Sequence, residues 1–372
     1  MKHYIKILLF ALITTLFVTS SVFAADSLRT KLPRNKYLSV RYLHGPVYDH
    51  RGLSGVLDFH STDGIGVEYL VETDGSRAWE NIYRHPRLGA AFYYEDFHYD
   101  VLGKAFSNAV IAEFPLVKRG FFGMDMRFLA GTGYVTKKFD SETNPDNLLV
   151  GSRFSAFFVF GPQFQFFMNR PQRLLAGFNF VHWSNGAMRL PNLGLNLMQW
   201  HIGVQGRIGG EKPRFQGEPV ETIVYNKWQK YVTAAFGVRE ANQPEGPKYC
   251  ILSTTAGIYR MMGKRTRIGA GLDFFRDPSD LKTFGNSGIE YSDGSPCLLG
   301  LHFAYGFCFG RTTATLHLGG FLFNEIYDEL PIYDRVVINY HITPHLMANL
   351  GLRTYFMRAE YIECGQIGRA HV

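Results

Sequence analysis

The sequence lacks most of the motifs that identify cofactor-dependent and metal-dependent enzymes. It has no HExxH element, no phosphate-binding loop and no dinucleotide fingerprint. Its four cysteines include no CxxC pair, so their spacing suggests no disulfide framework, although a single bridge remains the alternative. Beyond the N-terminus no run of 18 apolar residues occurs, which argues against helical membrane spans. We therefore expect no cofactor and no metal, and we interpret the cysteines as strand residues.

The first residues have the composition of a secretory signal. A basic segment, Lys2–Lys6, precedes a short apolar run, Ile7–Val18, and Val22–Ala24 has the small-x-small pattern that a signal peptidase cleaves. A membrane-anchoring helix is the alternative, but the apolar run is too short for one. We predict that residues 1–24 are a signal peptide.

The last six residues, Ile367–Val372, do not resemble the rest of the chain. Their sequence, IGRAHV, resembles the translation of a common sequencing adapter. We interpret residues 367–372 as an artefactual tail, set them aside from the fold, and expect the natural chain to continue past Gln366.

Segments of about ten residues with alternating polarity recur through the mature chain. In Phe122–Ala130, for example, apolar residues alternate with Asp125 and Arg127. Successive side chains of a strand face opposite sides of its sheet, so each segment has an apolar and a polar face. In a soluble sandwich the polar face would meet water, whereas in a transmembrane barrel it would meet the lumen. The signal peptide and the 15% aromatic content favour the barrel. We expect interior charge pairs that involve Asp125, Arg127, Arg153, Arg267 and Asp273.

Short turns alternate with longer connections, as periplasmic turns and extracellular loops do in outer-membrane barrels. Residues 25–208 contain about eight strands and residues 228–366 about eight more, joined by residues 209–227. We predict an all-β fold, a transmembrane antiparallel β-barrel of about 14–16 strands in the outer membrane of a Gram-negative bacterium. One barrel is favoured over two, because separate barrels would each need their own edges closed. The stretch Glu72–Ile82 breaks the alternation and is unexplained.

The most informative residues lie on one strand and on its return strand. If Leu174–Ser184 is a strand, His182 and Ser184 share a face that is otherwise apolar. On the return strand, Asn196 shares the apolar face with Trp200. With odd-numbered strands rising from the periplasm, a hydroxyl, an imidazole and an amide are predicted to face lipid at the outer rim.

The inward face of these and later strands carries larger polar and aromatic side chains. Trp183 is expected to pack in the lumen. We expect the inward histidines to line the lumen at scattered depths without a metal-ligand grouping; they are His201, His302 and His317.

The rim segment resembles a known family. His182-Trp183-Ser184-Asn185, followed by Pro191-Asn192, is similar to the motif of the PagL-type lipid A 3-O-deacylases, which are outer-membrane barrel esterases. The resemblance covers roughly the first half of the mature chain and implies that the second half is an addition. The family has an acidic residue where this chain has Asn196, which is a departure from the family's pattern.

The resemblance implies a role for each residue of the motif. Ser184 would be the nucleophile and His182 its general base, and Asn192 with the backbone N–H groups around Gly186 would hold the oxyanion. Asn196 is able to orient His182 through its amide oxygen, as in a Cys-His-Asn arrangement, but it does not neutralise the imidazolium.

Two further loop residues belong to the predicted oxyanion and substrate site. Asn185 follows the nucleophile directly. Arg189 is placed to pair with a lipid A phosphate, since guanidinium binds phosphate bidentately, and a solvated loop side chain is the alternative. Asn192 has an alternative role as a turn residue after proline.

We predict an outer-membrane esterase that removes an ester-linked acyl chain from lipid A through an acyl-enzyme on Ser184. Lipopolysaccharide is the expected substrate and outer-membrane lipid the surroundings, and no nucleic-acid module is visible. The alternatives are a porin or structural barrel without chemistry, and a phospholipase on the same fold.

Overall fold

The computed structural model describes residues 34–48, 61–214, 228–240, 243–281, 297–324, 332–343, 346–355 and 358–370. The predicted signal peptide lies outside these residues. Antiparallel strands make up most of the described chain, which confirms the predicted all-β class. No helix in the described segments is long and apolar enough to cross a membrane.

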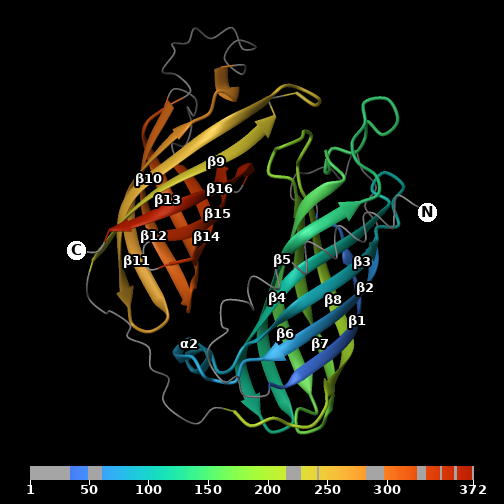
Figure 1. Cartoon of the computed structure of the whole chain (residues 1–372). Helices are drawn as coiled ribbons and strands as arrows, with labels where there is room; N and C mark the ends of the chain where they lie inside the picture. The colour runs from blue at the N-terminus through green and yellow to red at the C-terminus, as the bar shows by residue number, and fades with distance from the viewer. Residues whose placement is uncertain are drawn as a thin grey trace. The chain divides into compact units, whose positions relative to one another are not determined.

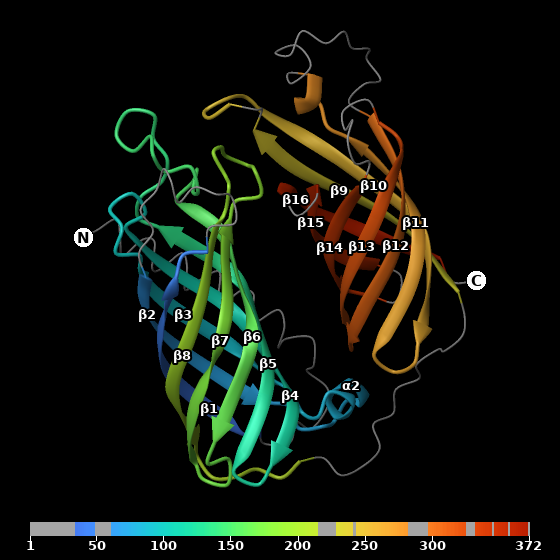
Figure 2. The same cartoon turned by 180° about the vertical axis from the view of Figure 1, so that it is seen from behind.

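Eight strands form a first closed barrel, coloured blue to yellow-green in Figure 1 and seen from behind in Figure 2. Each strand pairs with the next along the chain, and the last returns to the first, where Val204 lies opposite Val40. The strands are β1 (Lys36–Pro46), β2 (Ser61–Glu72), β3 (Arg87–Asp96), β4 (Lys104–Arg119), β5 (Phe122–Val135), β6 (Phe154–Phe166), β7 (Gln172–Ser184) and β8 (Leu195–Ile208).

Eight further strands form a second closed barrel with the same up-and-down order. Its last strand pairs with its first, where Gln366 lies opposite Ala234. The strands are β9 (Gln229–Glu240), β10 (Lys248–Met262), β11 (Thr266–Arg276), β12 (Cys297–Phe309), β13 (Thr312–Phe323), β14 (Ile332–His341), β15 (Leu346–Tyr355) and β16 (Arg358–Ala370).

The number of strands agrees with the sequence prediction, but the expectation of a single barrel is wrong. The alternating pattern is the same in one large barrel and in two small ones, so the pairing of β8 with β1 and of β16 with β9 decides between them. Both sheets close on themselves and neither keeps an unpaired edge, which removes the reason for preferring one barrel. The chain divides into two compact units, each built around one barrel, with the loop residues Asn185–Asn192 grouped with the second unit.

Two segments differ from their sequence interpretation. The unexplained stretch after β2 contains a five-residue helix, α2 (Ala78–Ile82), and Glu80 on this helix accepts a hydrogen bond from the N–H of Gly75 (2.8 Å). At the other end of the chain, Ile367 pairs with Thr233 and is buried. Residues 367–370 therefore take part in β16, and their origin as a tail stays a prediction.

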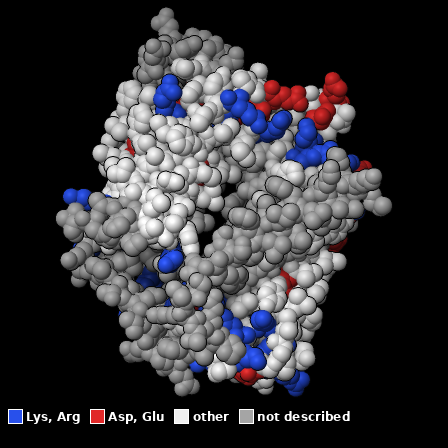
Figure 3. Space-filling model, in the orientation of Figure 1, with Lys and Arg blue, Asp and Glu red and all other residues white. Residues whose placement is uncertain are grey.

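Alternate residues of each strand face outward and are mostly apolar. In β1, Leu38 and Val40 are exposed, whereas Ser39 and Arg41 are buried. The visible surface over the strands is mostly white in Figure 3, and charged side chains gather toward the strand ends. An apolar outer band of this kind is what a lipid-facing barrel requires.

Charged side chains fill the middle of the first barrel. Glu68 accepts hydrogen bonds from Arg41 (2.6 Å) and from Arg127, and Glu113 pairs with Arg127 (3.1 Å) and Arg87 (2.9 Å). These side chains are buried. Each carboxylate contacts more than one guanidinium, so the layer is a network in which the charges compensate one another.

The predicted interior position is confirmed for Asp125 and wrong for Arg153. Asp125 is buried and pairs with Arg87. Arg153 precedes β6, is exposed and donates to the hydroxyl of Tyr134 (3.0 Å). A residue just outside a strand is not held to the alternation of that strand, which explains the error.

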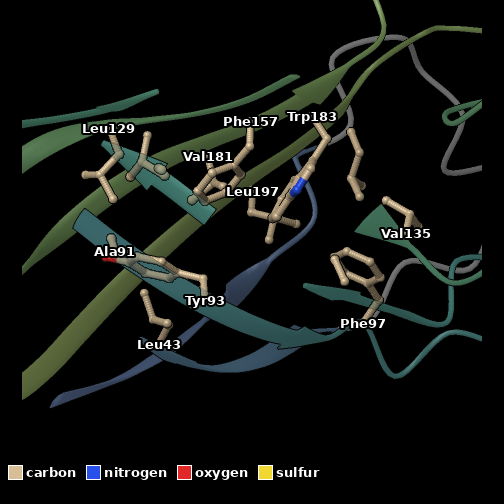
Figure 4. Packing of buried hydrophobic residues seen from close by; sticks show 14 of the residues in the cluster. Leu43, Ala91, Tyr93, Phe97, Leu129, Val135, Phe157, Val181, Trp183 and Leu197 are labelled. Carbon is tan, nitrogen blue, oxygen red and sulfur yellow. The ribbon is translucent and has the colours of Figure 1, made fainter. Parts of the chain in front are cut away.

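Apolar side chains close the long-loop end of the first barrel. Figure 4 shows Trp183, Phe157 and Phe97 packed together, and the ring of Trp183 lies 5.1 Å from that of Phe157 and 5.7 Å from that of Phe97. Trp183 is fully buried, as predicted, and its Nε1 donates to Ser107 (3.0 Å). This cap and the charged layer make the first barrel a packed scaffold.

The interior of the second barrel is organised around one arginine. Arg335 pairs with Asp273 (2.8 Å) and with Glu363. Asp273 also lies 2.6 Å from Nδ1 of His302 and accepts a hydrogen bond from the hydroxyl of Tyr333 (2.5 Å). The predicted interior position of Asp273 is confirmed.

Candidate active site

The predicted register of β7 and β8 is confirmed. Phe178 is 60% exposed and Asn179 is 2% exposed, so the even-numbered residues of β7 face outward. His182 lies on this outward face, directly opposite Asn196 of β8. Ser184 ends the strand two residues later on the same face. By the alternation of the two strands, the hydroxyl, the imidazole and the amide lie on the outward face of the barrel and not in its lumen, and on that face Ser184 is 7% exposed and Asn196 is 6% exposed.

The imidazole and the amide are in contact. Nδ1 of His182 lies 2.6 Å from Oδ1 of Asn196. Because an amide oxygen only accepts, Nδ1 carries the proton of the neutral ring and Nε2 keeps its lone pair. A general base needs this tautomer, and orienting it is the role of the third group in a catalytic triad.

The loop between β7 and β8 is organised by its own asparagines. Oδ1 of Asn192 accepts a hydrogen bond from the backbone N–H of Asn185 (3.1 Å), and Nδ2 of Asn185 donates to the carbonyl of Arg189 (2.9 Å). The Leu190–Pro191 peptide is cis, and Gly186 has a φ of 61°, which glycine adopts without steric cost. The side chain of Arg189 is exposed. Because Oδ1 of Asn192 accepts from the backbone N–H of Asn185, the amide NH₂ group of Asn192 points away from the backbone at Asn185.

Gly194 is a site residue that sequence reasoning missed. Its φ is 81°, and a Cβ there would lie 2.9 Å from Cε1 of His182. Its N–H donates to the carbonyl of Leu149 (3.2 Å), in the connection between β5 and β6. A glycine is therefore needed where the backbone passes against the imidazole. The sequence signal that could have found this residue is a glycine just before the return strand.

A second polar cluster lies on the outward face of the first barrel, at the same end. Asp63 of β2 lies 2.9 Å from Nδ1 of His44 and 2.7 Å from Nε2 of His98, and it also accepts a hydrogen bond from Tyr42. The indole of Trp200, opposite His44, is 38% exposed, which agrees with its predicted place on the outward apolar face. Sequence reasoning missed this cluster because its members come from segments that only the barrel brings together.

The expectation of scattered lumen histidines is wrong for two of them. The rings of His302 and His317 stack at 4.2 Å, and ligand atoms of both lie within 4.8 Å of Asp273. His201 is separate, in the first barrel, where its Nδ1 lies 3.0 Å from Arg41. Sequence reasoning missed the stacked pair because the stacking depends on the register of β12 against β13.

Comparison with protein families gives a match for each barrel. The model described as lipid A 3-O-deacylase (PagL) matches residues 63–205, and the model described as acyloxyacyl hydrolase, C-terminal domain, matches residues 227–368. No curated protein matches the chain. The first match contains all the residues of the candidate site.

Solved structures of outer-membrane proteins are similar at low identity. Neisserial surface protein A (NspA) has 10% identity and a TM-score of 0.32, covering 46% of this chain and 97% of its own. A triple mutant of the Rhodopseudomonas blastica porin has 10% identity and a TM-score of 0.18, covering 91% of this chain and 100% of its own.

The fold and the family matches define an outer-membrane β-barrel of the ester hydrolase class. More narrowly, the chain belongs to the PagL family of lipid A 3-O-deacylases, with a second barrel that matches the C-terminal domain model.

Proposed function

We propose that the first barrel removes an ester-linked acyl chain from lipid A by a serine mechanism. Oγ of Ser184 attacks the acyl carbonyl while Nε2 of His182 takes the hydroxyl proton. The tetrahedral intermediate collapses, and the proton on His182 passes to the departing sugar oxygen. Water then attacks the acyl-enzyme with His182 again as the base, which releases a fatty acid and restores Ser184.

The observation that carries the proposal is the outward-facing His182–Asn196 contact. The hydrogen bond from Nδ1 of His182 to Oδ1 of Asn196, 2.6 Å long, holds the imidazole in the tautomer that a base needs. The ring lies on the face that meets lipid. Ser184 shares that face. A lipid-embedded ester reaches an outward site without entering a lumen, so the position suits a water-insoluble substrate.

The β7–β8 loop supplies candidate oxyanion donors. The orientation of the Asn192 amide, fixed by the N–H of Asn185, presents its NH₂ group as a donor. The backbone N–H of Gly186 is a second candidate. One donor of this kind stabilises a transition state by about 3 kcal/mol. The exposed guanidinium of Arg189 would pair with a phosphate of the same substrate.

The polar cluster around Asp63 indicates how deep in the membrane the site lies. The cluster lies on the outward face, at the same end of the barrel as the site. Its histidines and carboxylate would be costly within the hydrocarbon of the membrane. This end of the barrel therefore belongs at headgroup level, where the ester bonds of lipid A lie.

The test is mass spectrometry of lipid A from cells that express the protein or its variants. The wild type should remove one acyl chain, and Ser184→Ala should lower the rate at least about a thousandfold, because the nucleophile is lost. Thr254→Ala, which removes an outward hydroxyl from the second barrel, is the matched control and should match the wild type. Identical acyl patterns for the wild type and Ser184→Ala would refute the mechanism.

Two further measurements separate the alternatives. Assays on defined phospholipids beside lipid A distinguish a deacylase from a phospholipase. In planar bilayers a porin would give a large, steady conductance. The charged layer and apolar cap inside the first barrel argue against such a conductance there.

A further inference from the structure

The second barrel contains a small polar cavity near its short-turn end. The cavity has a volume of about 20 Å³, enough for a species the size of one water molecule or slightly larger. Its polar lining includes the side chains of Tyr231, Thr233, Arg267, Thr315, His317 and Asn349.

Three polar atoms at this cavity are buried without a hydrogen-bond partner among the described residues. They are Oγ1 of Thr233, Nδ1 of His317 and Oδ1 of Asn349. Buried polar atoms in proteins nearly always have a partner, and three orphans around one cavity point to a polar occupant. Asn349 shares an amide–amide bond with Asn339 (2.9 Å), and reversing both amides keeps that bond while making the orphaned atom a donor.

Arg267 gives the cavity its charge. Its side chain is 7% exposed, its Nη2 donates to Thr315 (2.8 Å), and its guanidinium stacks on Tyr259 at 4.6 Å. No carboxylate of the described residues lies within 4.0 Å of it, whereas Arg335 beside it pairs with Asp273 and with a glutamate. A buried guanidinium without a counter-ion is costly, so the charge favours a negative occupant.

A metal cation fits the same region poorly, although Asp273, His302 and His317 lie close together. The two imidazole rings are stacked with an angle of 11° between their planes. Imidazole lone pairs lie in the ring plane, so two nearly parallel rings do not converge on one ion. Asp273 is already bound to Arg335 and to His302, and two buried guanidinium groups repel a cation.

We infer that the cavity binds a small monovalent anion, a halide or a carboxylate of formate size. The guanidinium of Arg267 supplies the charge, and the hydroxyl of Thr233 and the Nδ1–H of His317 donate to the anion. The site lies in the second barrel and does not depend on the serine chemistry of the first.

The experiment measures the thermal unfolding of the folded, full-length protein in detergent micelles. Sodium bromide and, separately, sodium formate replace sodium gluconate at constant ionic strength. A ligand that binds only the folded state raises the melting temperature in a saturable way. We expect this rise with bromide or with formate, and the stronger of the two identifies the class of anion. A wild type that shows no saturable rise with either salt overturns the proposal.

Variants locate the effect. Arg267→Leu should weaken the anion response at least about tenfold, because it removes a charged donor. Arg260→Leu is the matched control. Arg260 lies on β10, beside the strand of Arg267, and packs on Trp228, so its loss should leave the anion response unchanged. An undiminished response in Arg267→Leu would place the anion elsewhere and overturn the proposal.

A second variant keeps the test decisive if Arg267→Leu fails to fold. Thr233→Val preserves the shape of the side chain and removes one donor, so it should weaken the response about three- to tenfold. An unchanged anion response in this variant would overturn the proposal. A saturable rise in the melting temperature of the wild type with zinc sulfate would also overturn it, if His317→Gln removes that rise, because the site would then bind a cation.

Discussion

The two barrels have the same number of strands and the same pairing order, but their described seventh strands, β7 and β15, differ in the side chains on the outward face. At corresponding outward positions, β7 has Phe180, His182 and Ser184, whereas β15 has Leu350 and Leu352. Both rows belong to the outward face of their strands, and only the row on β7 contains a hydroxyl and an imidazole. An architecture that is repeated does not repeat its chemistry, because the chemistry depends on a few side chains added to it.

The interiors of the two barrels differ in how densely their charged side chains are paired. The first barrel is filled by a network in which three arginines and three carboxylates share contacts. The second has a shorter chain of contacts around Arg335 and leaves Arg267 beside a cavity. A densely cross-linked interior holds the strands of the first barrel in register, which an outer site built on two neighbouring strands requires.

The largest expected effect tests the difference between the two interiors. Glu68→Leu should lower the free energy of unfolding by about 3–5 kcal/mol, because it leaves Arg41 and Arg127 buried with less compensating charge. Glu363→Leu in the second barrel should cost less, since Arg335 keeps Asp273 at 2.8 Å. Urea unfolding in lipid vesicles measures both. Equal losses in the two variants would show that the networks are equivalent.

A smaller effect tests whether the outer rim of the first barrel is a catalytic site. Asn196→Asp should raise kcat/KM for lipid A about tenfold, because a carboxylate 2.6 Å from Nδ1 supports the imidazolium that forms in the transition state. Asn196→Leu, which removes the acceptor, should lower the rate. Steady-state deacylation of purified lipid A gives both values. A fully folded Asn196→Asp variant without a gain would mean that Asn196 does not act through His182.

Sequence reasoning predicted the geometry of the candidate site because the information for that geometry is local. The alternation within Leu174–Ser184 fixes which side chains share a face, and a neighbouring return strand places Asn196 opposite His182. The same reasoning failed where the structure depends on long-range pairing. One barrel and two barrels have identical alternation, and the contacts of Asp63 with His44 and His98 come from three separate segments.

Sequence reasoning also missed local features that the alternating pattern does not encode. The helix α2 has five residues, too few for a helical period to emerge from the sequence. Gly194 is recognisable as a site residue only when the position of His182 is known. The stacking of His302 on His317 requires the register that sets Ala304 opposite His317.

The smallest expected effect concerns the turn that distinguishes the first barrel from the second. α2 lies between β2 and β3, whereas the described connection between β10 and β11 is the three-residue turn Gly263–Arg265. Glu80 on α2 is buried, and burial, reinforced by the carboxylate of Asp74, raises its pKa to about 7. The folded state therefore holds a proton that the unfolded state releases from about pH 4.5 upward.

It follows that this carboxyl group destabilises the fold progressively as the pH rises from about 4.5 to about 7, and that its penalty is complete above that range. Glu80→Gln keeps an acceptor for the N–H of Gly75 and removes the titration, so stability between pH 5 and 7 should become flatter, by about 1 kcal/mol after solvent screening. Glu142→Gln, an exposed glutamate in the β5–β6 connection, is the matched control and should leave the slope unchanged. Urea unfolding at several pH values measures the slopes. If Glu80→Gln keeps the wild-type slope, the ionisation of this turn does not contribute to the stability of the first barrel.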